Sequence, residues 1–370
     1  MEQIILNNTN LKDNLLDILN KNGAHTIMWI CTNSFRKQNI YLQFKEIMHN
    51  YAIVEFSDFT PNPQYESVCR GVNLFRENNA NFIIATGGGS ALDIAKCIKM
   101  FARMQDGKNY LEQTIFDSNI PILAVPTTAG AGSEATRFAV IYYQNKKYSV
   151  SHESCIPNYV LFEPAVLRTL PEYQKKVTMF DALCHAIESF WSIRSTEESL
   201  TYSKEAIRII MEYEKAYWAN TKEGNRQMLR AAYIAGKAIN ITQTTAGHAM
   251  SYKLTNLYGI AHGHAVTLCV SKLWPYMLNN LDQCVDKRGK LYLNNIFNSI
   301  AQCMNCTKAK EAADKFEGMI AEYGLKAPTL KTDEDVSILC ESVNVERLKN
   351  NPIYLDKTTI NKFYKQILYS

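Results

Sequence analysis

Four side chains in the second half of the chain have the chemistry of metal ligands. Asp181 and His185 are four residues apart in an amphipathic pattern, which places both on one face of a helix. His248 and His262 each lie next to a glycine, in AGHAM and AHGHA. One carboxylate and three imidazoles suit Fe²⁺, Zn²⁺ or another divalent first-row metal. The spacing alone leaves a second interpretation open, in which the histidines are hydrogen-bonded residues of the core.

A glycine-rich turn in the first half is typical of phosphate binding. TGGGSALDIAK (86–96) follows an apolar segment and begins a helical pattern. Glycine lets the backbone approach a ligand closely, and a helix N-terminus presents free N–H groups to a phosphate. Ser90 could cap the helix or contact the phosphate. Because the segment is not GxGxxG, it could also be a tight strand-to-helix connection.

A second turn, VPTTAGAGSEAT (125–136), has small residues and hydroxyls after an apolar segment. Ligands of parallel α/β sheets bind at the carboxyl ends of the strands, so two such turns predict a dinucleotide site better than either alone. An ordinary flexible loop is the alternative. The residues predicted to contact the cofactor are Asn33, Ser34, Phe35, Gly87, Gly88, Gly89, Ser90, Asp93, Thr127, Thr128 and Ser133.

The segment TNSFRKQN (32–39) bears on the choice of cofactor. It lacks an acidic residue that would hold the ribose 2′-OH of NADH. Arg36 and Lys37 could instead meet the 2′-phosphate of NADPH, although both could be solvated surface charges. The sequence therefore slightly favours NADPH over NADH.

The elements that must position these residues change in character near residue 165. Short apolar segments alternate with helical patterns before it, which predicts βαβ units and a parallel sheet. Strands are expected at 25–32, 51–56, 81–90, 121–128, 138–143 and 159–162, and an amphipathic helix over the first 19 residues. Long amphipathic patterns follow Pro171. We expect an α/β dinucleotide-binding domain at 1–165 and an all-α metal-binding domain at 166–370.

Composition limits the classes of function. The 370 residues are 46% hydrophobic and 21% charged, which fits a globular protein of two domains. A net charge of +4 argues against nucleic-acid binding. With no apolar run long enough to cross a bilayer and no signal-peptide pattern, we expect a cytoplasmic protein without a membrane partner. The ten cysteines are expected to be reduced, including the CxxC pair Cys303 and Cys306. The sequence leaves a monomer or a homodimer open.

Four segments resemble, in order and spacing, those of the iron-containing (group III) alcohol dehydrogenases: TGGGSALDIAK, PTTAGAGSEAT, DALCHAIES and HAMSYKLTNLYGIAHGHAV. PNPQYESV (61–68) and PNYVLFEP (157–164) also fit, so the resemblance spans roughly 55–275. It implies a dehydroquinate synthase-like fold and places the family's metal ligands at Asp181, His185, His248 and His262. It also implies the reaction, in which a metal polarises an aldehyde and NADH or NADPH delivers hydride.

A narrower resemblance concerns the substrate. EATRFAVIYY, IESFWSIRSTEES and the segment around His248 are similar to the branch that reduces phosphonoacetaldehyde to 2-hydroxyethylphosphonate. An anionic substrate needs cations or donors, although any one candidate could be a surface charge. The candidates are Arg137, Arg194, Ser195 and Lys253. The alternatives are a general short-chain alcohol or diol dehydrogenase, a dehydroquinate-synthase-like lyase and a non-catalytic binding protein.

Three positions depart from the family's pattern. Met179 stands where many members have glycine, and Glu163 where many have aspartate. Tyr252 stands where many have a second histidine, which puts a proton relay through that histidine in doubt. Tyr252 or His264 could take the catalytic role of proton relay, or water could. Both side chains could instead only pack or bond to metal ligands.

Overall fold

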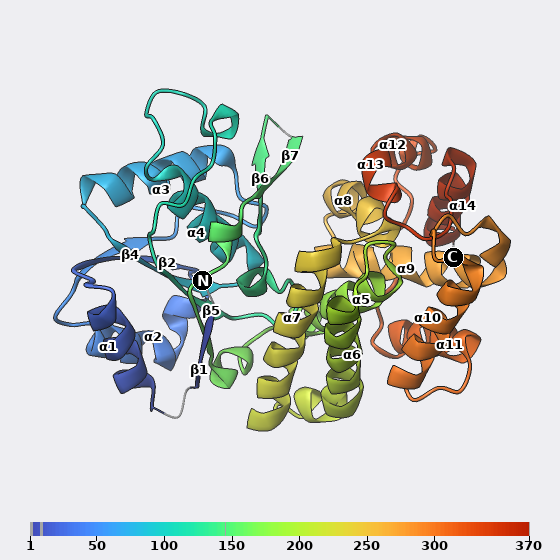
Figure 1. Cartoon of the computed structure of the whole chain (residues 1–370), viewed down its shortest axis with the longest axis horizontal. Helices are drawn as coiled ribbons and strands as arrows, with labels where there is room; N and C mark the ends of the chain where they lie inside the picture. The colour runs from blue at the N-terminus through green and yellow to red at the C-terminus, as the bar shows by residue number, and fades with distance from the viewer. Residues whose placement is uncertain (1–2, 8–9, 145, 370) are drawn as a thin grey trace. The chain divides into compact units, whose positions relative to one another are not determined.

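The computed structural model describes residues 3–7, 10–144 and 146–369 and divides into two compact units (Figure 1). The first runs to Leu170 and includes Asn220–Leu229, and the second comprises Pro171–Ala219 and the chain from Arg230 onward. A single boundary at residue 165 was predicted. In the structure the first unit also includes the later segment 220–229. Asn225 Nδ2 donates to the carbonyl of Pro164 at 3.3 Å and ties this segment to that unit.

The first unit is built on a six-stranded parallel sheet with the order β1-β8-β5-β4-β2-β3. Its strands are β1 (Ile4–Asn7), β2 (Thr26–Cys31), β3 (Ala52–Phe56), β4 (Phe82–Gly87), β5 (Ile122–Pro126) and β8 (Tyr159–Phe162). Cys31 is in register with Thr86, and Gly87 with Pro126. The three central strands β2, β4 and β5 therefore end together at one edge of the sheet.

The strand order reverses between β2 and β4. The chain leaves β2 toward β3 on one side and leaves β4 toward β5 on the other. Ligands of open α/β sheets bind at such a switch point, outside the carboxyl ends of the strands. The segments predicted to hold the cofactor follow β2, β4 and β5, so the topology places them at this edge.

Two strands were not predicted. The expected helix over the first 19 residues is wrong at β1, which lies at the sheet edge with Ile4 and Ile5 more than a third exposed. The predicted strand 138–143 is present as β6 (Phe138–Tyr143), but it pairs antiparallel with β7 (Lys146–Ser151) instead of joining the parallel sheet. The sequence of β7, KKYSVS, buries only Val150, so it carries little apolar signal.

Helices cover the sheet of the first unit and make up the second. The helices of the first unit are α1 (Leu11–Lys21), α2 (Asn39–Ile47), α3 (Tyr65–Glu77) and α4 (Gly89–Phe101). Those that follow are α5 (Glu172–Trp191), α6 (Glu197–Trp218), α7 (Lys222–Thr242), α8 (Ala246–Tyr258), α9 (His262–Asn279), α10 (Gly289–Cys303), α11 (Ala309–Glu322), α12 (Asp335–Glu341), α13 (Val345–Leu348) and α14 (Lys357–Leu368). The predicted fold class, an α/β domain followed by an all-α domain, is confirmed.

Helix α5 is the centre of the second unit. From Met179 to Trp191 every residue is buried, and the helix packs against both α6 and α9. None of the helices among the described residues has an apolar stretch long enough to cross a bilayer. All ten cysteines are free thiols, as predicted, and Cys303 is the last residue of α10.

Candidate metal centre and cofactor site

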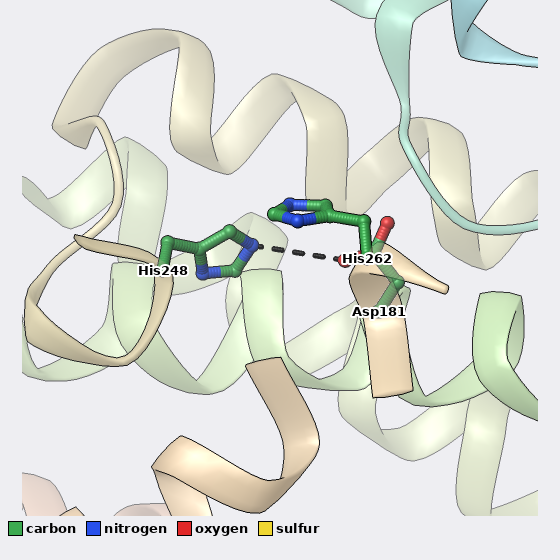
Figure 2. A group of neighbouring side chains, drawn as sticks. All are labelled: Asp181, His248 and His262. Carbon is green, nitrogen blue, oxygen red and sulfur yellow. Dashed lines mark ion pairs between the residues drawn. The ribbon is translucent and has the colours of Figure 1, made fainter. Parts of the chain in front are cut away.

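Three of the four predicted metal ligands converge from three helices. Figure 2 shows Asp181 of α5, His248 of α8 and His262 of α9 gathered around one point, with one ligand atom of each within 4.8 Å of the others. Asp181 Oδ1 and His248 Nε2 are 3.7 Å apart. Two ligand atoms on one tetrahedral metal are roughly 3.4 Å apart, given metal–ligand bonds of about 2.1 Å. The group could therefore hold one divalent ion.

Two buried polar atoms of this group, one on Asp181 and one on His248, lack a hydrogen-bond partner among the described residues. These atoms are Asp181 Oδ1 and His248 Nε2. Leaving a buried polar atom unsatisfied costs about 1–3 kcal/mol, so such atoms ordinarily have a partner. A cation between them would satisfy both, and the donor set thus fits a metal ion.

The electrostatics of the group favour a cation. Burial alone would raise the pKa of Asp181, but His185, His248 and His262 outweigh it and hold that pKa well below its usual range. Burial would lower the pKa of His248, but the carboxylates of Glu188 and Asp181 raise it to about 9. The two carboxylates therefore stabilise positive charge at this point, whether a proton or a metal ion carries it.

The fourth predicted ligand, His185, lies beside the group. It follows Asp181 by one turn of α5, and its ring stacks on His248 with the centroids 4.5 Å apart. Among the described residues, the set of ligand atoms within 4.8 Å of one another does not include a nitrogen of His185. Its role as a ligand stays a prediction.

A close helix contact positions His262. A Cβ on Gly263 would lie 2.1 Å from the carbonyl oxygen of Val177 and 2.8 Å from the Cβ of Asp181. Only glycine allows α9 to approach α5 this closely. The approach brings His262, the first residue of α9, next to Asp181.

Glu188 is a functional residue that the sequence analysis missed. Its side chain is fully buried, and one carboxylate oxygen contacts His248 Nδ1. The other oxygen accepts from the backbone N–H of Thr245 at 3.1 Å and from its hydroxyl at 2.6 Å. A carboxylate on Nδ1 fixes the tautomer of the ring and leaves Nε2 for a metal. The available signal was the spacing of Asp181, His185 and Glu188, which share one helix face.

We expect Glu188→Gln to weaken metal binding by about 10–100-fold, because the amide no longer holds His248 in this tautomer as a charged acceptor does. The dissociation constant for Zn²⁺ is measured by calorimetric titration of the metal-free protein. Glu172→Gln is the matched control, since Glu172 lies exposed at the start of the same helix and pairs with Lys176. Equal Zn²⁺ affinity in both variants would show that Glu188 does not support the site.

Of the two predicted relay residues, Tyr252 lies beside the metal group and His264 does not. The ring of Tyr252 stacks on His262 at 5.5 Å with an interplanar angle of 3°. His264 Nδ1 lies 3.0 Å from the hydroxyl of Tyr173, which also accepts from the N–H of Ala261. Two residues along a helix turn the side chain by about 200°, so His264 points away from His262.

The glycine-rich turn and the second turn lie against each other after β4 and β5. The N–H of Thr127 donates to the carbonyl of Gly87 at 3.0 Å, and a Cβ on Gly88 would lie 3.2 Å from Thr128 Oγ1. Gly88 is the N-cap of α4, so of the two roles left open for Ser90 the capping role is excluded, and the phosphate contact stays a prediction. Gly89 and Ser90 begin the helix, where their N–H groups have no partner within the helix.

Asp93 and Ser133 form hydrogen bonds that hold the second turn against α4. Ser133 Oγ donates to Asp93 Oδ1 at 2.7 Å, and the N–H of Val140 donates to Asp93 Oδ2 at 3.1 Å. The buried Lys96, which the sequence analysis missed, donates to Ser133 Oγ at 2.9 Å and to the carbonyl of Thr136 at 2.8 Å. These bonds tie the end of the second turn and strand β6 to α4.

The residues after β2 divide into exposed and buried positions. Asn33 and Ser34 are exposed at the switch point. Phe35 is fully buried in a short 3-10 helix (Phe35–Lys37), where its ring packs on Trp29 and Phe44. A cofactor contact from the side chain of Phe35 does not fit this position.

Three of the four predicted substrate contacts have partners that are not residues of the metal group. Arg137 pairs with Glu153 at 2.8 Å, and Arg194 donates to Gln243. Ser195 Oγ accepts from Arg288 at 2.9 Å. Arg194 and Ser195 follow the end of α5, which lies about 15 Å along the helix from Asp181. Lys253 is exposed on α8 next to Tyr252.

Comparison with known proteins agrees with this geometry. The model of the iron-containing alcohol dehydrogenase family matches residues 3–164, and that of the C-terminal domain of the same family matches residues 175–368. The chain therefore belongs to the iron-containing alcohol dehydrogenase family. It is an NAD(P)-linked oxidoreductase of alcohols and aldehydes, as the resemblance predicted.

One related sequence and two solved structures are similar to this chain. Phosphonoacetaldehyde reductase of Streptomyces viridochromogenes is 29% identical over 316 residues, which cover 80% of this chain and 78% of that protein. The crystal structure of sulfoacetaldehyde reductase from Bifidobacterium kashiwanohense in complex with NAD+ has a TM-score of 0.86 at 25% identity, over 99% of this chain and 96% of that one. An iron-containing alcohol dehydrogenase from Thermococcus thioreducens shares the fold, with a TM-score of 0.88 at 17% identity over 100% and 99% of the two chains.

Proposed function

We propose that this chain reduces a two-carbon aldehyde that carries an acid group, namely phosphonoacetaldehyde, to the corresponding alcohol. The observation that carries the proposal is the group of Asp181, His248 and His262, in which one buried ligand atom of Asp181 and one of His248 have no hydrogen-bond partner among the described residues. The names of the two relatives, a phosphonoacetaldehyde reductase and a sulfoacetaldehyde reductase, denote aldehydes of this class.

The residues of the chain have separate tasks in this reaction. Asp181, His248 and His262, with His185 as a fourth ligand, would hold Fe²⁺, Zn²⁺ or another divalent ion. Such an ion supplies Lewis acidity toward the aldehyde oxygen. The turns after β2, β4 and β5 bind the dinucleotide and orient its nicotinamide, which supplies the hydride. Tyr252 would pass a proton to the product oxygen, and its stacking on His262 supports this role.

A general alcohol or diol dehydrogenase is the second candidate. It is favoured by the pairing of Arg137 with Glu153 and of Ser195 with Arg288, since these predicted anion contacts are already engaged. A neutral aldehyde would need no such contact. The two candidates share the metal group and the cofactor site and differ only in the substrate.

Kinetics with matched aldehydes separate the two. The metal-loaded protein is assayed for NAD(P)H oxidation with phosphonoacetaldehyde and with propanal. We expect kcat/KM to be about 10–100-fold higher for the phosphonate, because charge-assisted hydrogen bonds are worth about 1.5–3 kcal/mol. A preference for propanal would replace the phosphonate assignment with the general alcohol dehydrogenase.

We expect NADPH to be the preferred cofactor, by a modest factor. Arg36 and Lys37 lie after β2 at the switch point, where they can meet a 2′-phosphate. Arg36 is also paired with Glu55 at 2.9 Å, and this carboxylate offsets the attraction of Arg36 for a phosphate. Glu55→Gln should therefore increase the preference for NADPH over NADH in kcat/KM. A clear preference for NADH in the unaltered protein would contradict this expectation.

A further inference from the structure

We infer that Arg347, which none of the sequence patterns singled out, receives the anionic group of the substrate beside the metal group. Arg347 lies on α13, a short helix that packs against α8 (Figure 1). Helix α8 carries both His248 and Tyr252. The inference rests on the proposed reduction of an anionic aldehyde and names the residue that would select it.

The contact of Arg347 with the metal group runs through Tyr252. Arg347 Nη1 donates to the hydroxyl of Tyr252 at 2.7 Å, and its guanidinium carbon lies 5.2 Å from the centroid of that ring. The same ring stacks on His262 with the centroids 5.5 Å apart. The guanidinium is therefore no farther from the His262 ring than the sum of these two distances, about 11 Å.

A substrate that contacts both the metal group and Arg347 must span part of this distance, the rest being taken up by the metal–oxygen bond and the hydrogen bond to the guanidinium. In an aldehyde with one methylene before the acid group, the acid oxygens lie roughly 4–5 Å from the aldehyde oxygen, judged from ordinary bond lengths. His262 is the half-exposed member of the metal group, and Tyr252 and Arg347 are also partly exposed. The side chain of Tyr252 thus lies between the proposed metal ligand His262 and the cation Arg347, and contacts both.

The charge of Arg347 is not used elsewhere in the described part of the chain. No carboxylate there lies within ion-pair distance of its guanidinium, and the neighbouring Glu346 pairs with Lys349 at 2.6 Å instead. A guanidinium has five N–H donors, of which one is given to Tyr252. The planar fork that remains matches the oxygens of a phosphonate or sulfonate.

The anion contact is distinguished from a purely structural clamp on Tyr252 by comparing two aldehydes. We expect Arg347→Ala to lower kcat/KM for phosphonoacetaldehyde by about 10–100-fold, mainly through KM, while kcat/KM for propanal changes by less than about threefold. Arg347→Lys should recover part of the loss because it keeps the charge. Lys349→Ala, which removes a cation from the same turn, should change neither value.

Direct binding gives a second readout that does not depend on turnover. Ethylphosphonate, which lacks the aldehyde, is titrated calorimetrically into the metal-loaded wild type and Arg347→Ala. We expect binding to weaken by about 10-fold or more in the variant. Equal losses for both aldehydes, or unchanged ethylphosphonate binding, would overturn the role of Arg347.

The two proposals fail in different ways. If the wild type prefers phosphonoacetaldehyde and Arg347→Ala keeps that preference, the role of Arg347 is overturned and the proposed function stands. If the wild type prefers propanal, the proposed substrate fails. In that case, the comparison of ethylphosphonate binding by the wild type and Arg347→Ala alone decides whether Arg347 is an anion site.

Discussion

Replacing His262 by alanine is expected to remove the bound metal and the reductase activity together. His262 is one of three side chains whose ligand atoms lie within 4.8 Å of one another, and it begins α9 beside the contact of Gly263 with α5. Loss of His262 leaves Asp181 and His248, 3.7 Å apart, and the proposed fourth ligand His185 to hold the ion. Because a Lewis acid supplies several kcal/mol of catalysis, turnover should fall by about 1,000-fold or more.

Metal content is measured on the same preparations that are assayed. His49→Ala is the control, since His49 is an exposed histidine at the end of α2 in the first unit. It should keep both the metal and the activity. A His262→Ala protein with full metal content and normal turnover would refute the assignment of His262.

Replacing Gly88 by valine is expected to weaken cofactor binding by about 10–100-fold while the protein stays folded. The branched side chain would occupy the space in which the backbone N–H groups at the start of α4 meet a phosphate, and a lost charge-assisted bond is worth about 1.5–3 kcal/mol. The backbone of Gly88 is extended, with φ −77° and ψ −171°, which valine adopts readily. The three atoms nearest to a Cβ there all belong to the side chain of Thr128, with Oγ1 at 3.2 Å and Cγ2 at 3.3 Å.

The choice of glycine matters for this test. A Cβ on Gly87 would lie 2.5 Å from the Cβ of Ala91, so a variant at Gly87 would disturb the fold itself. Gly318→Val is the control, because nothing lies within 4 Å of a Cβ at that position. Cofactor affinity is measured by fluorescence titration, and folding by the melting temperature. Unchanged affinity in Gly88→Val would place the phosphates elsewhere.

The parts of the fold that could be predicted are those whose signal is local. Strands β2, β4 and β5 are fully buried or nearly so, and their apolar runs were visible in the sequence. The polar strand β7 carries little of that signal because it buries only Val150. The edge strand β1 has the apolar residues IIL, but so short a run was not distinguished from the helical pattern that follows it. Helical spacing likewise placed Asp181 and His185 on one face of α5.

The residues that were missed or misplaced depend on long-range packing. Glu188 meets His248 across 60 positions of sequence, and Arg347 meets Tyr252 across 95, which no spacing rule anticipates. His264 was a candidate relay because it is close in sequence to His262. Since α9 begins at His262, a separation of two residues points the side chains in different directions.

We propose that this chain is a metal-dependent aldehyde reductase whose ion is held by Asp181, His248 and His262, with His185 as the fourth ligand. The most direct test of this proposal is to strip the protein of metal, reload it with Fe²⁺ or Zn²⁺, and measure metal content and NADPH-linked reduction of phosphonoacetaldehyde at each step. We predict that the stripped protein still binds NADPH but does not turn over, and that one ion per chain restores activity. Full turnover by the metal-free protein, or restored activity in His262→Ala at the same metal concentration, would contradict this account.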